Sequence, residues 1–297
     1  MRQSLNWERY GHDWPNREAS RFIRASGIVW HVQIMGAGPP VLLLHGTGAS
    51  VHSFAALMPL LASDFTLVAP DLPGQGFTQA PPREFLSLPG MARAIAGLLR
   101  ELDIRPQLAV GHSAGAAVAI QMTVSRQIAP RAIVSLNGAL LPLSGMAGQI
   151  FAPLAKLLTA IPFVSDLFAR RAGDPTAIER MIEQTGSNLD ERGKELYRRL
   201  ASNPAHVAAA LGMMAHWDLR SFAAELPRLK VPLTLVVGSN DRTIPPSQAE
   251  HVREIVPQAK IVTLPGLGHL AHEERPEQCA AIIRAVAQDA GLTAEAG

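Results

Sequence analysis

The chain has 297 residues, of which 47% are hydrophobic and 18% charged, and its formal net charge is +2. This length supports one large domain, or one domain with an inserted subdomain, and this composition is that of a globular protein with a sizeable core. Lysine and arginine form no run or patch, so nucleic acid is not an expected partner.

The cysteine count and the lack of a recognisable targeting pattern favour a cytoplasmic location. Cys279 is the single cysteine, so a disulfide within the chain is excluded. Residues 1–22 are charged and aromatic and have no apolar core of a secretory signal. Apolar runs stay shorter than the roughly 18 residues of a membrane-spanning helix. We therefore expect a cytoplasmic protein without a transmembrane segment.

Short apolar segments alternate with helical patterns along most of the chain. Residues 21–36 predict two short strands joined at Ser26-Gly27. Further apolar runs predict buried parallel strands within 39–46, 65–74, 107–113, 132–138, 233–241 and 259–269. Helical patterns lie at roughly 52–61, 87–102, 114–127, 246–256 and 276–290. This order predicts an α/β sheet with its site at the carboxyl ends of the strands.

The alternation stops between about residues 139 and 222, where only helical patterns occur. We interpret this part as a helical cap inserted after the sixth parallel-type strand. It divides the chain into core residues 1–138, cap residues 139–222 and core residues 223–297.

The cap is strongly apolar in its first half. The apolar residues there are Phe151, Leu154, Leu157, Leu158, Ile161, Phe163, Leu167 and Phe168. They predict packing onto the core; the alternative is a hydrophobic substrate entrance, or a patch that contacts the inner membrane surface. Near the end of the cap, Met213, Met214 and Trp217 are candidate substrate contacts, and core packing explains them equally well.

A serine between two glycines follows one of the predicted strands. Gly111-His112-Ser113-Ala114-Gly115 matches the G-x-S-x-G pattern, in which a strained strand-to-helix turn exposes the serine hydroxyl. Side chains two residues before and two residues after would collide in such a turn, so both positions are glycine. The pattern predicts that Ser113 is a nucleophile, and the alternative is a structural turn.

A serine nucleophile needs a base that is held by an acid, and in this arrangement the chain order is Ser, Asp or Glu, His. Asp241 follows one predicted strand and His269 follows the next, with one helix between them. We therefore predict a triad of Ser113, Asp241 and His269. His272 is a weaker candidate base, because we expect it to point away from the site, and His112 is expected to be a packed residue beside the nucleophile.

The oxyanion hole of such a site needs two N–H donors. We predict the backbone N–H of Ala114, directly after the nucleophile, and that of Thr47 in the loop after the strand at 39–46. Asp71 is expected to hydrogen-bond the backbone of its own loop. Neither a metal-ligand spacing nor a phosphate-binding glycine loop is found in the sequence.

Together these segments resemble the α/β-hydrolase fold superfamily. The matching residues are "HGTG" at 45–48, "DLPGQGFT" at 71–78, "GHSAG" at 111–115, "GSNDRTIP" at 238–245 and "GLGHLAHEERPE" at 266–277. The resemblance covers about residues 20–297. It implies a mostly parallel eight-stranded sheet flanked by helices, an inserted helical cap and a Ser-Asp-His triad.

A closer resemblance concerns the segments at 5–22, 42–54 and 69–78. They are similar to a group of α/β-hydrolase homologues from photosynthetic bacteria, the magnesium chelatase accessory proteins of bacteriochlorophyll biosynthesis. We expect histidine in that group where this chain has Gln75. The resemblance implies a tetrapyrrole or magnesium chelatase as partner, and it implies no particular reaction.

Three functions remain open from the sequence. The first is a serine hydrolase that acts on an ester or related carbonyl of a hydrophobic small molecule. The second is an accessory protein that binds a tetrapyrrole without catalysis, and the third is hydrolysis of a carbon–carbon bond. The triad favours the first and third functions, and it requires no cofactor.

Overall fold

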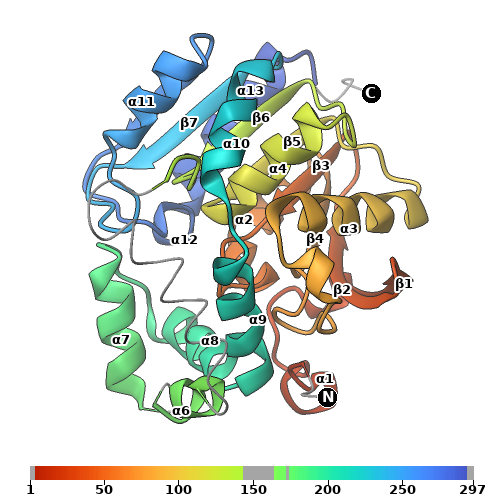
Figure 1. Ribbon diagram of the computed structural model, residues 1–297, viewed down its shortest axis with the longest axis vertical. Helices are drawn as coiled ribbons and strands as arrows, with labels where there is room; N and C mark the ends of the chain where they lie inside the picture. Colours follow the sequence, from red (N-terminus) through yellow and green to blue (C-terminus); the bar gives the residue numbers. More distant parts are fainter. Residues whose placement is uncertain (1–3, 143–163, 172–173, 293–297) are drawn as a thin grey trace.

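The computed structural model describes residues 4–142, 164–171 and 174–292 (Figure 1). Its sheet has eight strands in the order β1-β2-β4-β3-β5-β6-β7-β8. The strands are β1 (Ser20–Ala25), β2 (Ile28–Met35), β3 (Pro40–Leu44), β4 (Thr66–Pro70), β5 (Leu108–His112), β6 (Ala132–Leu136), β7 (Leu233–Gly238) and β8 (Lys260–Leu264). The pairs β1–β2 and β2–β4 are antiparallel and all others are parallel, so the predicted, mostly parallel sheet is confirmed.

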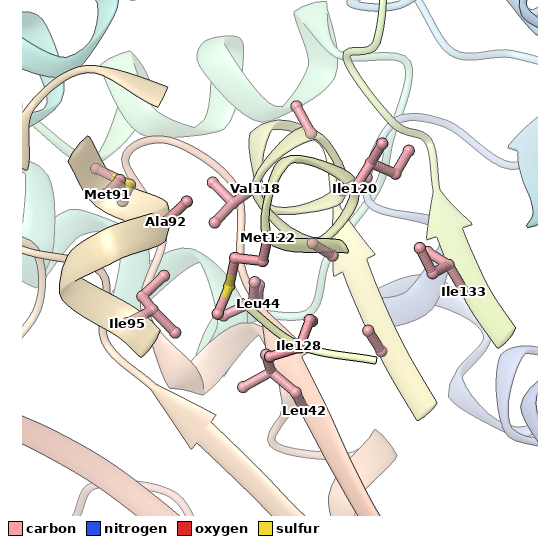
Figure 2. Close-up of a cluster of buried hydrophobic side chains, with 14 of the residues drawn as sticks. Leu42, Leu44, Met91, Ala92, Ile95, Val118, Ile120, Met122, Ile128 and Ile133 are labelled. Atoms are coloured by element: carbon pink, nitrogen blue, oxygen red, sulfur yellow. The ribbon is translucent and has the colours of Figure 1, made fainter. Parts of the chain in front are cut away.

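The helices of the core cover both faces of this sheet. They are α2 (Leu57–Leu61), α3 (Leu88–Glu101), α4 (Ala114–Val124), α11 (Gln248–Ile255), α12 (Ala271–Glu274) and α13 (Pro276–Asp289). Side chains of β3 alternate between the faces: Leu42 and Leu44 pack with α3 and α4, as Figure 2 shows, whereas Val41 and Leu43 pack with α2 and α13. The central strands are therefore buried on both faces, which is why they read as continuous apolar runs.

Among the described residues between β6 and β7, the structure has five further helices. They are α6 (Val164–Arg171), α7 (Pro175–Gln184), α8 (Glu191–Ala201), α9 (Pro204–Ala215) and α10 (Leu219–Glu225), and the first four gather at one end of the sheet (Figure 1). Four of the five helices begin after an aspartate or asparagine whose side chain accepts a backbone N–H of the first turn: Asp174, Asp190, Asn203 and Asp218. These caps explain where such short helices start.

The N-terminal segment packs between the loop after β4 and the helices that follow β6. It contains α1 (Trp7–Tyr10) and a short 3₁₀ turn, Arg17–Ala19. Trp7 and Trp14 contact the ring of Phe77 edge-on, with centroids 4.8 and 4.7 Å away. Arg199 of α8 forms an ion pair with Asp13 at 2.7 Å. The segment thus links the core loop 71–78 to α8.

Candidate active site

Ser113 stands in a sharp turn between β5 and α4. Its φ of 52° and ψ of −119° are strained for a residue with a side chain. A Cβ on Gly111 would lie 2.4 Å from the backbone N and Cα of Ala116, and one on Gly115 would lie 2.1 Å from the carbonyl oxygen of Leu44. The turn therefore forms only with glycine at both positions, as the sequence pattern predicts.

The loop after β3 lies against this turn. A Cβ on Gly46 would be 3.0 Å from the Cβ of Ser113, so the loop backbone passes directly beside the serine. Thr47 is the next residue, and Ala114 begins α4, where the first N–H groups have no acceptor within the helix. Both N–H groups predicted for the oxyanion hole thus belong to backbone segments that adjoin Ser113.

His45 shapes this loop from within. Its buried ring donates Nδ1–H to the carbonyl oxygen of Gly46 at 2.8 Å, and its Nε2 accepts the N–H of Leu72 at 2.9 Å. Burial lowers the pKa of His45, although the Asp71 carboxylate opposes this shift. A neutral ring has one donor and one acceptor, and both are used, so His45 connects the loop after β3 to the loop after β4.

Asp241 and His269 form a buried hydrogen-bonded pair at the carboxyl ends of β7 and β8. The His269 Nδ1–H donates to Asp241 Oδ2 at 2.8 Å. The other carboxylate oxygen, Oδ1, accepts the N–H groups of Thr243 and Ile244 at 2.8 and 2.9 Å. These bonds fix the carboxylate, which in turn fixes the ring orientation and leaves Nε2 as the free ring nitrogen.

Asn137 is a site residue that sequence reasoning missed. It follows β6 with a φ of 47°, a conformation that asparagine tolerates better than most residues, and its Nδ2 donates to Asp241 Oδ2 at 2.8 Å. The segment "LNG" at residues 136–138 held the available signal, because it places a polar residue at the same sheet edge as Ser113 and Asp241.

His112 connects the serine turn to the His269 loop. Its Nε2–H donates to the carbonyl oxygen of His269 at 2.9 Å, and the ring centroids of the two histidines are 4.9 Å apart. Burial lowers the pKa of His112 well below its usual value, so the ring is neutral. The residue before the candidate nucleophile therefore holds the backbone of the candidate base.

The segment between α7 and α8 also fixes the Asp241 and His269 loops. The carbonyl oxygen of Thr185 accepts the N–H of Arg242 and of His269, each at 3.2 Å. Asn240 Nδ2 donates to the carbonyl oxygen of Gly186 at 2.7 Å. These hydrogen bonds connect the segment between α7 and α8 to the loops that carry Asp241 and His269. The periodicity of the sequence gives no indication of such contacts.

A second serine, histidine and aspartate series lies elsewhere in the fold. His31 Nδ1–H donates to Asp71 Oδ2 at 2.8 Å, and His31 Nε2 is 3.0 Å from Ser20 Oγ. Asp71 also accepts the N–H groups of Val51 and Phe77, which agrees with the expectation that it supports loop backbone. Ser20 begins strand β1 and lacks the strained turn of Ser113, so its geometry is that of a strand residue.

His272 belongs to a buried polar network beside the site. Its Nε2 is 2.8 Å from Ser53 Oγ, which donates to Glu273; Tyr197 of α8 donates to the same carboxyl oxygen at 2.7 Å. Burial lowers the pKa of His272 to about 3 and raises that of Glu273 to about 7. His272 thus belongs to the hydrogen-bond network that connects α8 to α12. It is not the histidine that is bonded to Asp241.

Glu273 predicts a pH dependence of stability. Because its folded pKa of about 7 is above the usual value of 4.5, the folded state binds the proton more tightly, and stability falls as pH rises between these two values. The variant Glu273→Gln keeps an acceptor for Tyr197 without the charge. Its free energy of unfolding relative to wild type should rise by up to about 3 kcal/mol from pH 4.5 to pH 8.

Chemical denaturation across this pH range measures the effect. Buried histidines such as His52, whose pKa burial lowers to about 3, give stability an opposite pH dependence. Their contribution is common to both proteins and cancels in the difference. The matched control is Glu277→Gln, which makes the same substitution at an exposed position. A pH-dependent difference for Glu273→Gln no larger than that of the control would contradict the assigned titration of Glu273.

The candidate substrate contacts lie at two depths. Met213 is buried, and its Sδ accepts Thr47 Oγ1–H at 3.4 Å, which places it beside the predicted oxyanion loop. Met214 is half-buried, and the half-buried Trp217 packs against the core cluster. A cavity of about 20 Å³ borders Asp241, which is room for one water molecule and not for a substrate.

Most of the apolar residues expected to form a substrate entrance or membrane patch lie outside the described residues. These are Phe151, Leu154, Leu157, Leu158, Ile161 and Phe163. Leu167 and Phe168 of α6 are described, and both are exposed. Within the described ranges, no helix is long and apolar enough to span a bilayer, and no group of three or more histidine, cysteine or acidic side chains is arranged for a metal ion.

Comparisons with known proteins agree with this architecture. The chain is 37% identical over 263 residues to the magnesium-chelatase 30 kDa subunit of Rhodobacter capsulatus, which covers 88% of this chain and 92% of that one. It is 31% identical to a pyrrolizixenacetamide deacetylase of Xenorhabdus hominickii, over 84% of this chain and 91% of that one.

Solved structures and a family model give the same assignment. A thermophilic esterase from Thermogutta terrifontis superposes with a TM-score of 0.71 at 26% identity, over 91% of this chain and 98% of that one. The model of the alpha/beta hydrolase family matches residues 41–282. Together with the eight-stranded sheet, these matches show that the chain belongs to the alpha/beta hydrolase family.

Proposed function

We propose that this protein is a serine hydrolase with Ser113 as nucleophile, His269 as general base and Asp241 as the acid that orients it. The observation that carries the proposal is the buried His269–Asp241 hydrogen bond of 2.8 Å in loops joined, through His112, to the strained turn of Ser113. A serine hydroxyl is a weak nucleophile, and a structural turn needs neither this pair nor the strain.

In the proposed reaction, Ser113 Oγ attacks the carbonyl carbon while its proton passes to His269 Nε2. The N–H groups of Thr47 and Ala114 stabilise the negative charge on the carbonyl oxygen. His269 then donates the proton to the leaving group, and an acyl-enzyme remains. A water molecule, deprotonated by His269, attacks the acyl carbon and releases the acid and Ser113.

The proposed substrate is an ester or related carbonyl of a hydrophobic small molecule. One apolar side chain supports this class: Met213 of α9 contacts Thr47 directly. The relative named as a magnesium-chelatase subunit favours a tetrapyrrole ester over other hydrophobic esters. That relative also favours the second candidate, an accessory protein that holds a tetrapyrrole or assists magnesium chelatase.

Turnover of chromogenic esters distinguishes the candidates. We expect measurable hydrolysis of p-nitrophenyl esters, with a preference for the longer acyl chain. Absence of turnover from the folded protein, together with saturable binding of a porphyrin in a fluorescence titration, would favour the accessory role. Absence of both would favour carbon–carbon bond hydrolysis, which a vinylogous 1,5-diketone would test directly.

A further inference from the structure

A buried histidine of α9 holds the loop that contains Thr47. The ring of His206 is almost fully buried; it donates Nε2–H to the carbonyl oxygen of Gly48 at 3.0 Å and accepts the N–H of Gly76 on Nδ1 at 3.0 Å. Burial lowers the pKa of His206 to about 4, so the ring is neutral near pH 7. Its one donor and one acceptor are both used on backbone groups, and neither is directed to solvent.

Gly48 is held from both sides. While His206 binds its carbonyl oxygen, its N–H donates to Gln75 Oε1 at 2.7 Å. Gln75 Nε2–H in turn donates to Met213 Sδ at 3.4 Å, the same sulfur that accepts Thr47 Oγ1–H. The φ of Gly48 is +80°, a conformation that only glycine adopts readily, so the loop needs such contacts to stay in one arrangement.

These contacts converge on the residue next to the predicted oxyanion donor. Thr47 is covalently followed by Gly48, and both peptide groups of Gly48 are fixed by side chains, one from α9 and one from the loop after β4. An N–H stabilises the oxyanion only if its direction is fixed before the charge develops. A displacement of about 1 Å in such a donor can lower a rate by about 100-fold.

We propose that His206 is a positioning residue for the oxyanion hole: by binding the Gly48 carbonyl oxygen, it directs the Thr47 N–H toward the reacting carbonyl. The inference rests on the proposed function above. Helix α9 thereby affects catalysis although it lies outside the sheet core, because its residues His206 and Met213 both contact the loop that contains Thr47.

Two conservative variants separate positioning from packing. Glutamine at position 206 places an amide N–H near the position of Nε2 and retains a donor for Gly48. Asparagine places its amide oxygen near the position of Nδ1, so it retains an acceptor for Gly76 and loses the bond to Gly48. If His206 only packs, the smaller asparagine and the longer glutamine should differ in stability and not in catalysis.

The experiment measures kcat and KM for a p-nitrophenyl ester, and the rate at which a fluorophosphonate labels Ser113, for wild type, His206→Gln and His206→Asn. We expect His206→Asn to lower kcat and the labelling rate at least about tenfold with KM changed by less than about threefold. His206→Gln should stay within about threefold of wild type. His216→Ala, which removes an exposed histidine directly after the same helix, is the matched control and should behave as wild type.

Each outcome decides the proposal. Equal losses in the two variants, no loss in either, or a change confined to KM would overturn it. If His206→Asn does not fold, a kcat of His206→Gln near that of wild type supports the Gly48 bond, and a tenfold loss overturns it. Wild-type protein that neither hydrolyses the ester nor reacts with the fluorophosphonate would refute the proposed function itself. The wild-type protein is therefore measured before the variants.

Discussion

Replacing Ser113 with alanine should lower kcat/KM for a chromogenic ester by on the order of 10⁴-fold or more, because no other group in the proposed site can form the acyl-enzyme. Ser113 holds its φ of 52° between Gly111 and Gly115, and alanine removes only the hydroxyl from that turn. The unfolding temperature should therefore stay close to that of wild type, and steady-state kinetics with thermal denaturation measure both quantities.

A matched serine variant makes this result specific. Ser20 also lies within hydrogen-bond distance of a buried histidine, at 3.0 Å from His31 Nε2, but it occupies a strand instead of a strained turn. We expect Ser20→Ala to keep the wild-type rate. If Ser20→Ala loses activity and Ser113→Ala keeps it, the nucleophile is Ser20, with His31 and Asp71 as its partners.

Changing Asp241 to asparagine should lower kcat by about 10⁴-fold while leaving the fold intact. The four hydrogen bonds to this carboxylate come from donors: His269 Nδ1–H and Asn137 Nδ2–H on Oδ2, and two backbone N–H groups on Oδ1. An asparagine amide must present its own NH₂ to one of these pairs. If the NH₂ faces His269, Nδ1 must accept a hydrogen bond, so the proton moves to Nε2 and the ring cannot act as the base. If the NH₂ faces the two backbone N–H groups, the loop must shift.

The double variant Ser113→Ala, Asp241→Asn provides the check on this argument. Members of a triad act as a unit, so the double variant should be no slower than Ser113→Ala alone. The control for charge is Asp289→Asn, which removes an exposed carboxylate from α13. An Asp241→Asn protein with more than about a tenth of the wild-type kcat would show that Asp241 does not orient the base.

The sheet was predictable because each of its central strands is buried on both faces and ends in a distinctive residue. Leu42 to Leu44 read as an apolar run, and Ser113, Asp241 and His269 each follow such a run directly or within a few residues. Parallel strands place their carboxyl ends at one edge, so the sequence order alone predicted that these loops meet. The hydrogen bond between Asp241 and His269 agrees with that prediction.

The supports of the site were not predictable from periodicity. Asn137 binds Asp241 from a strand end 104 positions earlier in the chain, and His206 reaches Gly48 across 158 positions. The His206 contact depends on how the helices between β6 and β7 dock onto the core, and an apolar pattern fixes only which face of a helix is buried. The bond from Tyr197 of α8 to Glu273 has the same origin, because it joins one of these helices to the core.

Intact-mass and peptide mass spectrometry after reaction with a fluorophosphonate tests the central claim most directly, because it reads the nucleophile without assuming a substrate. We expect one adduct per chain, on the peptide that contains Ser113, and no adduct in Ser113→Ala. An adduct on Ser20, or no adduct on a folded protein, would contradict the assignment of Ser113, Asp241 and His269 as a catalytic triad.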